Sequence, residues 1–417
     1  MAKIIVAAPP IPGEVGPLLQ VARALADRGH RITVLSGPSF RAETEDAGLA
    51  FAPLGGDADY DVREISAVRG DGLPPDAEEL NHGWIRALVD PMPDEHRALQ
   101  ALLEEDPDQY LISSVLFLGL LPIRYGVPGR QPRGWVGVSV IGLAITSEDA
   151  TFYGPVPLAG DENAVKVANR AANAVFAEVS TPTRERLREL LLDLGAAEPV
   201  TVAWPDVLYT APDAVAALTV PGFEFHRGDL PGTIHLVGAL PPLPARSWDA
   251  PAWWADLDGS RPVVVVVTSQ LVEPTLLGLA DRDVTVVAAL GGADPESLSI
   301  PLPANARVAS HLPFEALLPR TAVLITDGGI VGIQQALAAG VPVIVGGDTE
   351  DQPANATRVA HHQLGVDLRT GNPAPEAVAR AVTEVLGSPD IRENVTRLAK
   401  VYAQHDPIEE IERLAVG

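Results

Sequence analysis

The stretch AVLITDGGIVGIQQALAAGVPVIVGGDTEDQ, residues 322–352, decides the fold. Runs rich in valine, isoleucine and leucine at residues 322–326 and 341–345 predict two strands that are covered on both faces. Between these runs, a Gly-Gly turn is followed by an apolar pattern that predicts a helix over residues 331–339. A strand, a helix and a second strand of this kind form one β-α-β unit of a parallel sheet.

The two turns of this unit carry the best candidate for a binding site. Gly328 and Gly329 leave backbone N–H groups free at the start of the helix, where an anion is stabilised, although glycines there also suit a turn that serves geometry alone. Asp351 and Gln352 come just after the second strand. Ligands of open α/β sheets bind at the carboxyl ends of the strands, so we expect the ligand site of this half of the chain here.

The same stretch resembles the donor-binding signature of the family-1 glycosyltransferases with the GT-B fold. In that family the signature runs His-Gly-Gly-x-Gly-Thr, then Glu/Gln-Ala-Leu, Gly-Val-Pro and a distal Asp-Gln. The matching residues here are Gly328, Gly329, Gln335-Ala336-Leu337, Gly340-Val341-Pro342, Asp351-Gln352, Asn355 and Arg358-Val359. The resemblance covers nearly the whole chain and is closest to an actinobacterial branch that modifies lipids and natural products. It implies an α/β protein with two Rossmann-like domains that face each other across a cleft.

The rest of the chain fits this organisation. We expect an N-terminal acceptor-type domain over residues 1–239 and a C-terminal donor-type domain over residues 252–400. Residues 240–251, LPPLPARSWDAP, are rich in proline and polar residues and are typical of an interdomain linker. Residues 401–417 are expected to form a C-terminal helix, which in the resembling family returns to the N-terminal domain.

The composition excludes several classes of function. The chain has 417 residues, of which 47% are hydrophobic and 20% charged, enough to bury two ordinary domains. Its net charge of −25 opposes binding to a phosphate backbone, so we expect no nucleic-acid partner. The chain has no cysteine, and its nine histidines show no ligand spacing. We therefore expect no disulfide, no metal and no cofactor.

The sequence also predicts a cytoplasmic protein without an integral membrane segment. The apolar run at the N-terminus is too short for the hydrophobic region of a signal peptide and ends in two prolines. No run approaches the roughly 18 apolar residues that a membrane span needs.

The resemblance also indicates where the acceptor chemistry lies. In the family, a histidine after the first strand deprotonates the acceptor hydroxyl, and an aspartate of the first domain orients that histidine. Glu14 stands at the histidine position, and Ser114, ahead of Leu116-Phe117-Leu118-Gly119, stands at the aspartate position. A carboxylate is a weaker base than imidazole at neutral pH unless burial raises its pKa. Glu14 is therefore either a repurposed acid/base or a residue that the helix dipole favours at a helix start.

A second part of the acceptor region is the stretch at residues 145–161, ITSEDATFYGPVPLAGD, which shows no clear period. In the resembling family this region forms a loop that faces the acceptor. Phe152 and Tyr153 either line a pocket there for an apolar small-molecule substrate or anchor the loop.

The donor half departs from the family pattern at several positions. Asp327 replaces the signature histidine, and two anionic groups within ~4 Å in a partly buried site repel by several kcal/mol. Val331 replaces the next glycine and adds bulk where a phosphate approaches the backbone. Thr268-Ser269-Gln270 runs directly into a helix and lacks about ten residues of the usual phosphate loop. His311 stands where an aromatic residue usually stacks on the nucleobase. The candidate donor site comprises His311, Asp327, Gly328, Gly329, Gln335, Asp351 and Gln352.

These departures favour an enzyme that keeps the acceptor pocket but has lost normal nucleotide-sugar use. We expect it to bind an apolar intermediate of natural-product or antibiotic biosynthesis and to perform acid/base chemistry, such as cyclisation or rearrangement, with Glu14 transferring the proton. The alternative is a nucleotide-sugar-dependent glycosyltransferase that acts on a natural product or lipid with Glu14 as its base. A third interpretation is a non-catalytic partner of a true glycosyltransferase. The oligomeric state stays open, and a homodimer is one option.

Overall fold

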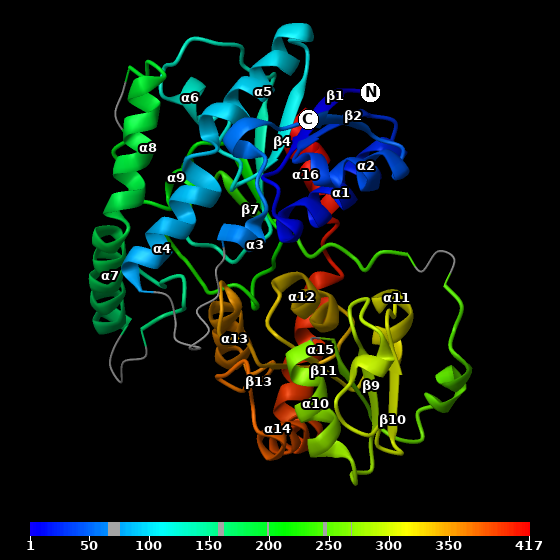
Figure 1. The fold of residues 1–417 in the computed structure, drawn as a ribbon. Coiled ribbons are helices and arrows are strands. Elements are labelled where there is room, and N and C mark those ends of the chain that lie inside the picture. The colour runs from blue at the N-terminus through cyan, green and yellow to red at the C-terminus, as the bar shows by residue number, and fades with distance from the viewer. Residues whose placement is uncertain (66–75, 157–161, 198–199, 245–247, 268) are drawn as a thin grey trace. The chain divides into compact units, whose positions relative to one another are not determined.

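The computed structural model describes residues 1–65, 76–156, 162–197, 200–244, 248–267 and 269–417 (Figure 1). Its packing divides the chain into two compact units. The first unit comprises Met1–Leu218, Arg227–Val237 and Asp406–Gly417, and the second comprises Thr219–His226 and Gly238–His405. Each unit is a Rossmann-like α/β domain built on its own parallel sheet, which confirms the predicted fold class.

A parallel sheet of seven strands forms the centre of the first unit. Its strands are β1 (Lys3–Ala7), β2 (Arg31–Ser36), β3 (Ala50–Pro53), β4 (Tyr110–Ser114), β5 (Trp135–Ser139), β6 (Ala214–Ala217) and β7 (Ile234–Leu236). They lie in the order β3-β2-β1-β4-β5-β6-β7. The central strands β1, β4 and β5 are almost entirely buried, as expected for strands that helices cover on both faces. Ala7 of β1 lies beside Ser113 of β4, so the carboxyl ends of these two strands meet.

Helices connect these strands (Figure 1). They are α1 (Pro12–Asp27), α2 (Arg41–Asp46), α3 (Val62–Ile65), α4 (Ala77–Trp84), α5 (Met92–Glu105), α6 (Leu121–Arg124), α7 (Glu162–Val179), α8 (Thr181–Asp193) and α9 (Val207–Thr210). The first of them, α1, begins at Pro12, where the missing N–H of proline is not needed. It ends before Gly29, whose φ of 93° suits glycine. The elements β1, α1 and β2 therefore form a β-α-β unit at the start of the chain.

The last helix of the chain, α16 (Pro407–Val416), packs within the first unit. Its neighbours include α1, β4, β5 and β6. Arg28, at the end of α1, donates to Glu412 Oε2 at 2.6 Å, and His30 Nε2 lies 2.8 Å from Glu412 Oε1. These polar contacts fix the end of the chain beside the end of α1.

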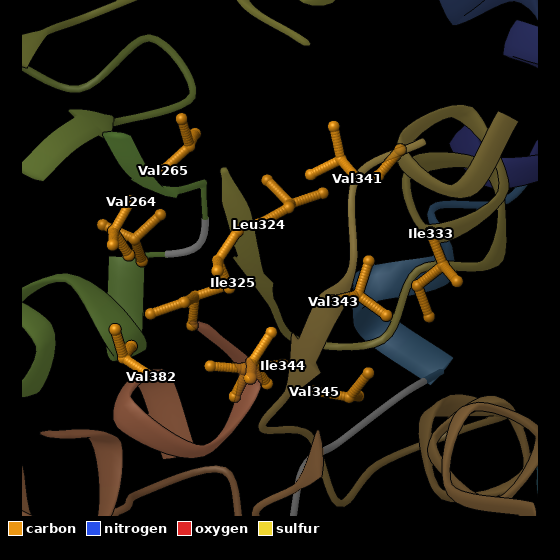
Figure 2. Packing of buried hydrophobic residues seen from close by; sticks show 14 of the residues in the cluster. Val264, Val265, Leu324, Ile325, Ile333, Val341, Val343, Ile344, Val345 and Val382 are labelled. Atoms are coloured by element: carbon orange, nitrogen blue, oxygen red, sulfur yellow. The ribbon is translucent and has the colours of Figure 1, made fainter. Parts of the chain in front are cut away.

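A parallel sheet of six strands forms the centre of the second unit. Its strands are β8 (Val263–Val266), β9 (Thr285–Ala289), β10 (Ala306–Ala309), β11 (Val323–Thr326), β12 (Val343–Val345) and β13 (Gly365–Asp367). They lie in the order β10-β9-β8-β11-β12-β13. The strands β8, β11 and β12 are wholly buried, and Val264, Ile325 and Ile344 belong to the core of the unit (Figure 2). The strands β11 and β12 arise from the two apolar runs that predicted buried strands.

The helices of the second unit are α10 (Ser269–Leu279), α11 (Phe314–Leu317), α12 (Ile330–Ala338), α13 (Gln352–His361), α14 (Pro375–Gly387) and α15 (Pro389–Tyr402). The elements β11, α12 and β12 form the β-α-β unit predicted from the opening stretch, and Leu324 pairs with Val343 across the two strands. Ile333, Ala336 and Leu337 of α12 are buried, because their spacing places them on one face of the helix.

The boundary between the units lies earlier than residue 239, where the sequence places the end of the first domain. Thr219–His226 groups with the second unit because Val220 and Phe223 belong to the core of that unit and Glu224 pairs with Arg358. Residues 240–251, the predicted linker, also group with the second unit, and residues 245–247 of this segment lie outside the described residues.

Candidate active site

Two of the predicted site residues, Glu14 and Ser114, meet at the carboxyl end of the first sheet. Glu14 lies in the first turn of α1, which follows β1, and only 4% of its surface is exposed. Ser114 is the last residue of β4, the strand beside β1, and is fully buried. The Ser114 hydroxyl donates to Glu14 Oε2 at 2.6 Å, so the serine holds the carboxylate in one orientation. The parallel sheet thus joins two positions that lie 100 residues apart in the sequence.

Two further titratable side chains belong to this region of the first unit, and the sequence analysis did not identify them. Glu95 is fully buried in α5, and its Oε2 accepts the N–H of Leu118 at 2.8 Å. Burial raises the pKa of Glu95 to about 8. Tyr60 donates to the Ala87 carbonyl at 2.6 Å, and burial raises the pKa of Tyr60, with the charges of Glu95 and Glu14 adding to the effect. A glutamate in a helix and a tyrosine in an acidic loop are ordinary patterns, so the sequence carried no signal for either residue.

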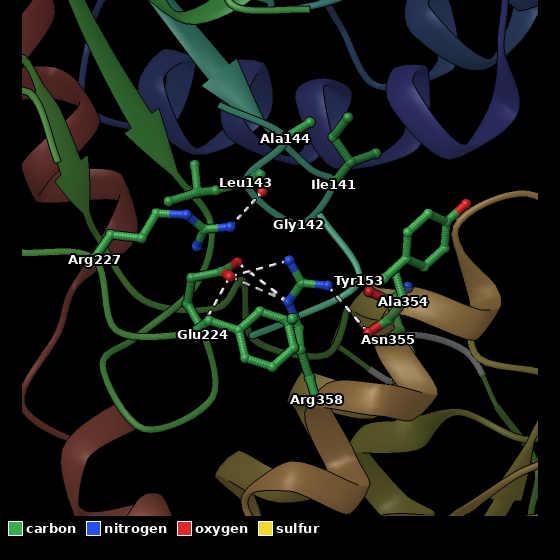
Figure 3. Close-up of polar contacts among 12 residues, drawn as sticks. Ile141, Gly142, Leu143, Ala144, Tyr153, Glu224, Arg227, Ala354, Asn355 and Arg358 are labelled. Atoms are coloured by element: carbon green, nitrogen blue, oxygen red, sulfur yellow. Dashed lines mark hydrogen bonds and ion pairs between the residues drawn. The ribbon is translucent and has the colours of Figure 1, made fainter. Parts of the chain in front are cut away.

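The loop that carries Phe152 and Tyr153 is anchored by hydrogen bonds within the first unit. Arg227 donates to the carbonyl of Leu143 at 2.9 Å (Figure 3) and to that of Thr151 at 3.3 Å. The rings of Phe152 and Tyr153 pack edge to face with their centres 5.2 Å apart. Residues 157–161 of this predicted stretch lie outside the described residues. That the two aromatic side chains line an acceptor pocket stays a prediction.

In the predicted anion-binding turn at the start of α12, a side chain of the protein itself accepts a backbone N–H. Gly328 has a φ of 116°, which favours glycine, and Gly329 is the N-cap residue of α12. Asp327 Oδ1 accepts the N–H of Gly329 at 3.3 Å and the hydroxyl of Thr326 at 3.2 Å. A carboxylate at a helix N-terminus is stabilised by unpaired N–H groups and by the helix dipole. Asp327 therefore takes a position suited to an external phosphate.

Asn355 ties this turn to the residues that follow β12. Its Nδ2 donates to the Gly328 carbonyl and to Asp351 Oδ2, both at 2.9 Å. Burial raises the pKa of Asp351, although the hydrogen bond from Asn355 lowers it. Burial also raises the pKa of Glu350, and the charges of Asp351 and Asp327 add to the effect. The two predicted turns thus form one site, with three neighbouring carboxyl groups at the carboxyl ends of β11 and β12.

The other predicted donor residues have different surroundings. Gln352 Oε1 accepts the N–H of Thr349 at 3.2 Å and its hydroxyl at 3.0 Å, which places this side chain in the turn before α13. Gln335 donates to the carbonyl of Leu240 at 3.3 Å and so holds the start of the predicted linker. His311 is exposed in the turn between β10 and α11. Its stacking on a nucleobase stays a prediction.

The shortened connection after β8 lies partly outside the described residues. Strand β8 ends at Val266 and α10 begins at Ser269, with Thr268 outside the described part of the chain. Val331, the other predicted departure on this side, is half-buried in the first turn of α12.

A buried ion pair that the sequence did not predict lies beside this site in the second unit. The side chains of Arg358 and Glu224 are 0% and 1% exposed, and Arg358 Nη2 donates to Glu224 Oε1 at 3.0 Å (Figure 3). The Arg358 guanidinium also lies 4.6 Å from the centre of the Phe225 ring. Because an unpaired charge in a protein interior is strongly destabilising, each partner needs the other. The pair fastens Thr219–His226 to α13.

Two further facts concern metal binding and membrane spans in the described residues. They contain no group of three or more histidine, aspartate or glutamate side chains that could hold a metal ion. Over the same residues, no helix has both the length and the apolar character needed to cross a membrane.

Two parallel-sheet domains, with candidate sites at the carboxyl ends of their strands, define a protein of the GT-B class. The solved structure of the calicheamicin glycosyltransferase CalG4 matches this fold with a TM-score of 0.73 and 21% identity, over 99% of this chain and 98% of that chain. Residues 273–416 match the family described as "Erythromycin biosynthesis protein CIII-like, C-terminal domain".

Sequence relatives extend over the whole chain. UDP-glucosyltransferase B1 of Starmerella bombicola is 30% identical over 429 residues, which cover 98% of this chain and 96% of the relative. The 4'-demethylrebeccamycin synthase of Lentzea aerocolonigenes is 30% identical over 419 residues, covering 98% of this chain and 97% of the relative. The chain therefore belongs to the family-1 glycosyltransferases of the GT-B fold.

These relatives correct the leading functional prediction. Loss of nucleotide-sugar use, with cyclisation or rearrangement in its place, is wrong, because a relative that matches along nearly the whole chain is named as a UDP-glucosyltransferase. Single substitutions in the family's motifs are therefore not sufficient to predict that nucleotide-sugar use is lost. Glu14 and Ser114 differ from the family's histidine and aspartate, yet they are hydrogen-bonded to each other where that pair is expected. The two positions are thus still joined by a hydrogen bond, with different side chains.

Proposed function

We propose that this protein is a nucleotide-sugar-dependent glycosyltransferase that transfers a sugar to a hydroxyl group of an apolar natural product or lipid. The relatives that match along the whole chain support the class of reaction. The observation that carries the assignment of its chemistry is the hydrogen bond from Ser114 to Glu14 at the carboxyl end of the first sheet. In this proposal the first unit binds the acceptor and the second unit binds the donor.

Glu14 acts as the general base. It takes the proton of the acceptor hydroxyl while the acceptor oxygen attacks the anomeric carbon of the sugar. The bond between that carbon and the diphosphate oxygen breaks, and the nucleoside diphosphate leaves with the electron pair. Ser114 donates to Oε2 and orients the Glu14 carboxylate, which accepts the proton. The position of Glu14 in the first turn of α1 favours the negatively charged form that a base needs.

The donor half contributes backbone groups at the start of α12 and side chains after β12. The N–H of Gly329 faces the diphosphate in this proposal, so the Asp327 carboxylate competes with the donor for it. Asp351 and Gln352 contact the sugar, and Asn355 holds Asp351 in place for this contact. The absence of cysteine fits a reducing compartment, and we propose a cytoplasmic enzyme.

The test is an assay of nucleoside diphosphate release by the full chain. UDP-glucose and TDP-glucose are each offered with a panel of hydroxylated aromatic and lipid acceptors, and the glycoside is identified by mass spectrometry. We expect release of the diphosphate that depends on the acceptor, together with a product heavier by one sugar. Calorimetry with UDP and TDP, run in parallel, measures binding of the donor without turnover.

The outcomes separate this proposal from the non-catalytic interpretation. Acceptor-dependent product from one donor supports the proposal. Binding of neither UDP nor TDP, together with no product from any pair, contradicts it. In that case, co-purification with a glycosyltransferase and an increase in the activity of that enzyme on addition of this chain support a partner protein.

A further inference from the structure

Glu95 is a buried carboxyl group in the first unit that the proposed mechanism does not use. It lies in the first turn of α5, and its exposed fraction is 0%. Its Oε2 accepts the N–H of Leu118 at 2.8 Å, whereas its Oε1 has no hydrogen-bond partner in the described part of the chain. A buried carboxyl oxygen without a partner is costly to keep, so a structural or functional reason for it is needed.

The segment that Glu95 holds begins at the site. Leu116 donates its N–H to Ser114 Oγ at 2.9 Å, and the N–H of Phe117 donates to the Ser114 carbonyl at 3.1 Å. At the other end of the segment, Leu118 is held by Glu95, and the Gly119 carbonyl lies 2.9 Å from His96 Nδ1. Residues 114–119 therefore form a turn whose first residue bonds to Glu14 and whose last two residues are fixed by α5.

Backbone packing shows how close this turn and α5 lie. A Cβ atom added to Gly119 would come within 3.0 Å of the carbonyl carbon of Glu95. The backbone of Gly119 therefore packs closely against that of Glu95. The position of the turn, and with it the position of Ser114, thus depends on the first turn of α5.

We propose that Glu95 is a positioning residue of the acceptor site: its carboxyl group holds the turn after β4, and through this turn it keeps Ser114 against Glu14. The inference rests on the proposed function, in which Glu14 is the base. Glu95 does not touch the acceptor in this proposal, and it acts through the backbone of residues 114–119.

The charge of Glu95 controls this contact. Burial raises the pKa of Glu95 to about 8, although the N–H groups of Leu118 and Gly119 lower it, so the group is mainly neutral at pH 7. The titratable groups around it are His96, whose pKa burial lowers, and Tyr60, whose pKa is raised by burial and by the charges of Glu95 and Glu14. Ionisation of Glu95 therefore places an additional negative charge in a region that already holds Glu14.

Because the pKa of Glu95 is raised in the closed turn, the stability of this turn depends on pH. The closed turn favours the protonated carboxyl, whereas an opened turn exposes a carboxyl with an ordinary pKa of about 4.3. The closed turn is therefore most stable below a pH of about 4.3, and its stability falls as the pH rises toward 8. The weakening is up to about tenfold per pH unit, and it levels off above about pH 8.

Three variants test the inference. Glu95→Gln keeps an acceptor for the Leu118 N–H and cannot ionise, and Glu95→Leu removes the acceptor. The matched control is Gln109→Leu, in the turn between α5 and β4, because Gln109 is also buried and donates to the carbonyls of Leu102 and Asp106. Thermal unfolding shows whether each variant is folded.

The first measurement does not depend on activity. Hydrogen exchange of the Leu118 amide in the full chain is followed from about pH 5 to about pH 9, corrected for the intrinsic rate. We expect its protection to fall over this range in the wild type and in Gln109→Leu, and to stay level in Glu95→Gln. A level profile in the wild type, or an equal fall in Glu95→Gln, overturns the inference whether or not the chain transfers sugar.

The second measurement is kinetic and uses the donor and acceptor pair found in the release assay. We expect Glu95→Leu to lower kcat by about 10²-fold with little change in the KM for the donor, because a shift of about 1 Å at the site has an effect of this size. The wild type should lose kcat as the pH rises toward about 8, and Glu95→Gln should keep it. Unchanged kcat in a folded Glu95→Leu overturns the inference. If the wild type transfers no sugar, the proposed function fails while the exchange measurement still decides the role of Glu95.

Discussion

The two units of this protein each place a carboxylate at a helix start where the family has a histidine, and the two carboxylates have different surroundings. Glu14 is buried in the first turn of α1, and Ser114 on the neighbouring strand donates to it. Asp327 is half-buried before α12 and accepts an N–H from the start of that same helix. Glu14 is thus oriented by another segment of the chain, whereas Asp327 is held by its own turn.

This difference shows that one type of substitution has two consequences. A carboxylate held by a neighbouring strand has a defined direction and can receive a proton from a substrate. A carboxylate that accepts an N–H of its own turn occupies a donor group that a diphosphate needs, and it adds a negative charge beside the donor. We therefore expect substitutions at Glu14 to lower turnover and substitutions at Asp327 to alter donor affinity.

The largest effect is expected for Glu14→Gln. The amide keeps the size of the side chain but cannot accept the proton of the acceptor, so kcat should fall by about 10²–10⁴-fold. Steady-state kinetics give kcat, and calorimetry shows whether UDP-glucose still binds.

The control for this prediction is Glu43→Gln, at an exposed position of α2, which should keep wild-type turnover. Glu14→Asp should lose less than Glu14→Gln, because the acid survives at a shorter reach. Full turnover in Glu14→Gln would assign Glu14 to the start of α1 alone.

A smaller loss of turnover is expected for Ser114→Ala. This change removes the hydroxyl that donates to Glu14 Oε2. A hydrogen bond to a charged group contributes about 1.5–3 kcal/mol, so kcat should fall by roughly 10–100-fold. Donor affinity should stay the same, because Ser114 lies in the first unit. Ser114→Thr, which keeps the hydroxyl, is the control, and a loss in Thr equal to that in Ala would show a packing effect instead of a lost hydrogen bond.

At the donor side, Asp327→Asn should improve binding of UDP by about tenfold. The change removes a negative charge beside the diphosphate and weakens the competition for the Gly329 N–H. This gain in affinity is well below the gain expected from removing a buried pair of like charges, because Asp327 is only half-buried. Calorimetry with UDP measures it. An unchanged affinity would place the diphosphate away from Asp327.

Much of the fold could be predicted because its central strands carry their own signal. The buried strands β8, β11 and β12 consist almost entirely of valine, isoleucine and leucine. The strands β3, β10 and β13 were missed, since each lies at the edge of its sheet and is only partly buried. In β13, a Cβ atom on Gly365 would lie 1.7 Å from the Val343 carbonyl, so close backbone packing sets this strand.

Residues 116–125, LFLGLLPIRY, have an apolar pattern that on its own predicts a helix, and they show how tertiary contacts override a local pattern. Only Leu121–Arg124 is helical, because Ser114 and Glu95 hold residues 116–119 in a turn instead. Glu95 lies 23 residues from Leu118 in the sequence. No local period reveals a contact of this kind.

The candidate site could also be predicted only in part. The positions Glu14 and Ser114 followed from a family pattern, and the sheet brings them together. The hydrogen bond from the Gly329 N–H to Asp327 could not be predicted, because it depends on the direction in which a short side chain turns. The pair of Glu224 and Arg358 lies 134 residues apart in the sequence and needs the folded unit to become visible.

The smallest expected effect concerns pH at the donor side. Burial raises the pKa of Asp351 and of Glu350, and the neighbouring carboxylates add to both shifts. These groups therefore take up protons at a higher pH than ordinary carboxyl groups, whose pKa values lie near 4. Each proton removes a negative charge that faces the donor, while the diphosphate of a sugar nucleotide keeps its charge over this range.

Affinity for UDP-glucose should consequently rise by about threefold as the pH falls from about 7 to about 5, because partial protonation removes less repulsion than a full charge change. Glu350→Gln should show a shallower slope, since one of the two titrating groups is then permanently neutral. Glu376→Gln, in the first turn of α14, is the control and should keep the wild-type slope. Calorimetry at several pH values gives each slope. Equal slopes in Glu350→Gln and the wild type would show that the charge of Glu350 does not act on the donor, and Asp351 would then be the titrating group. An affinity of the wild type that does not change with pH would show that neither carboxyl group acts on the donor.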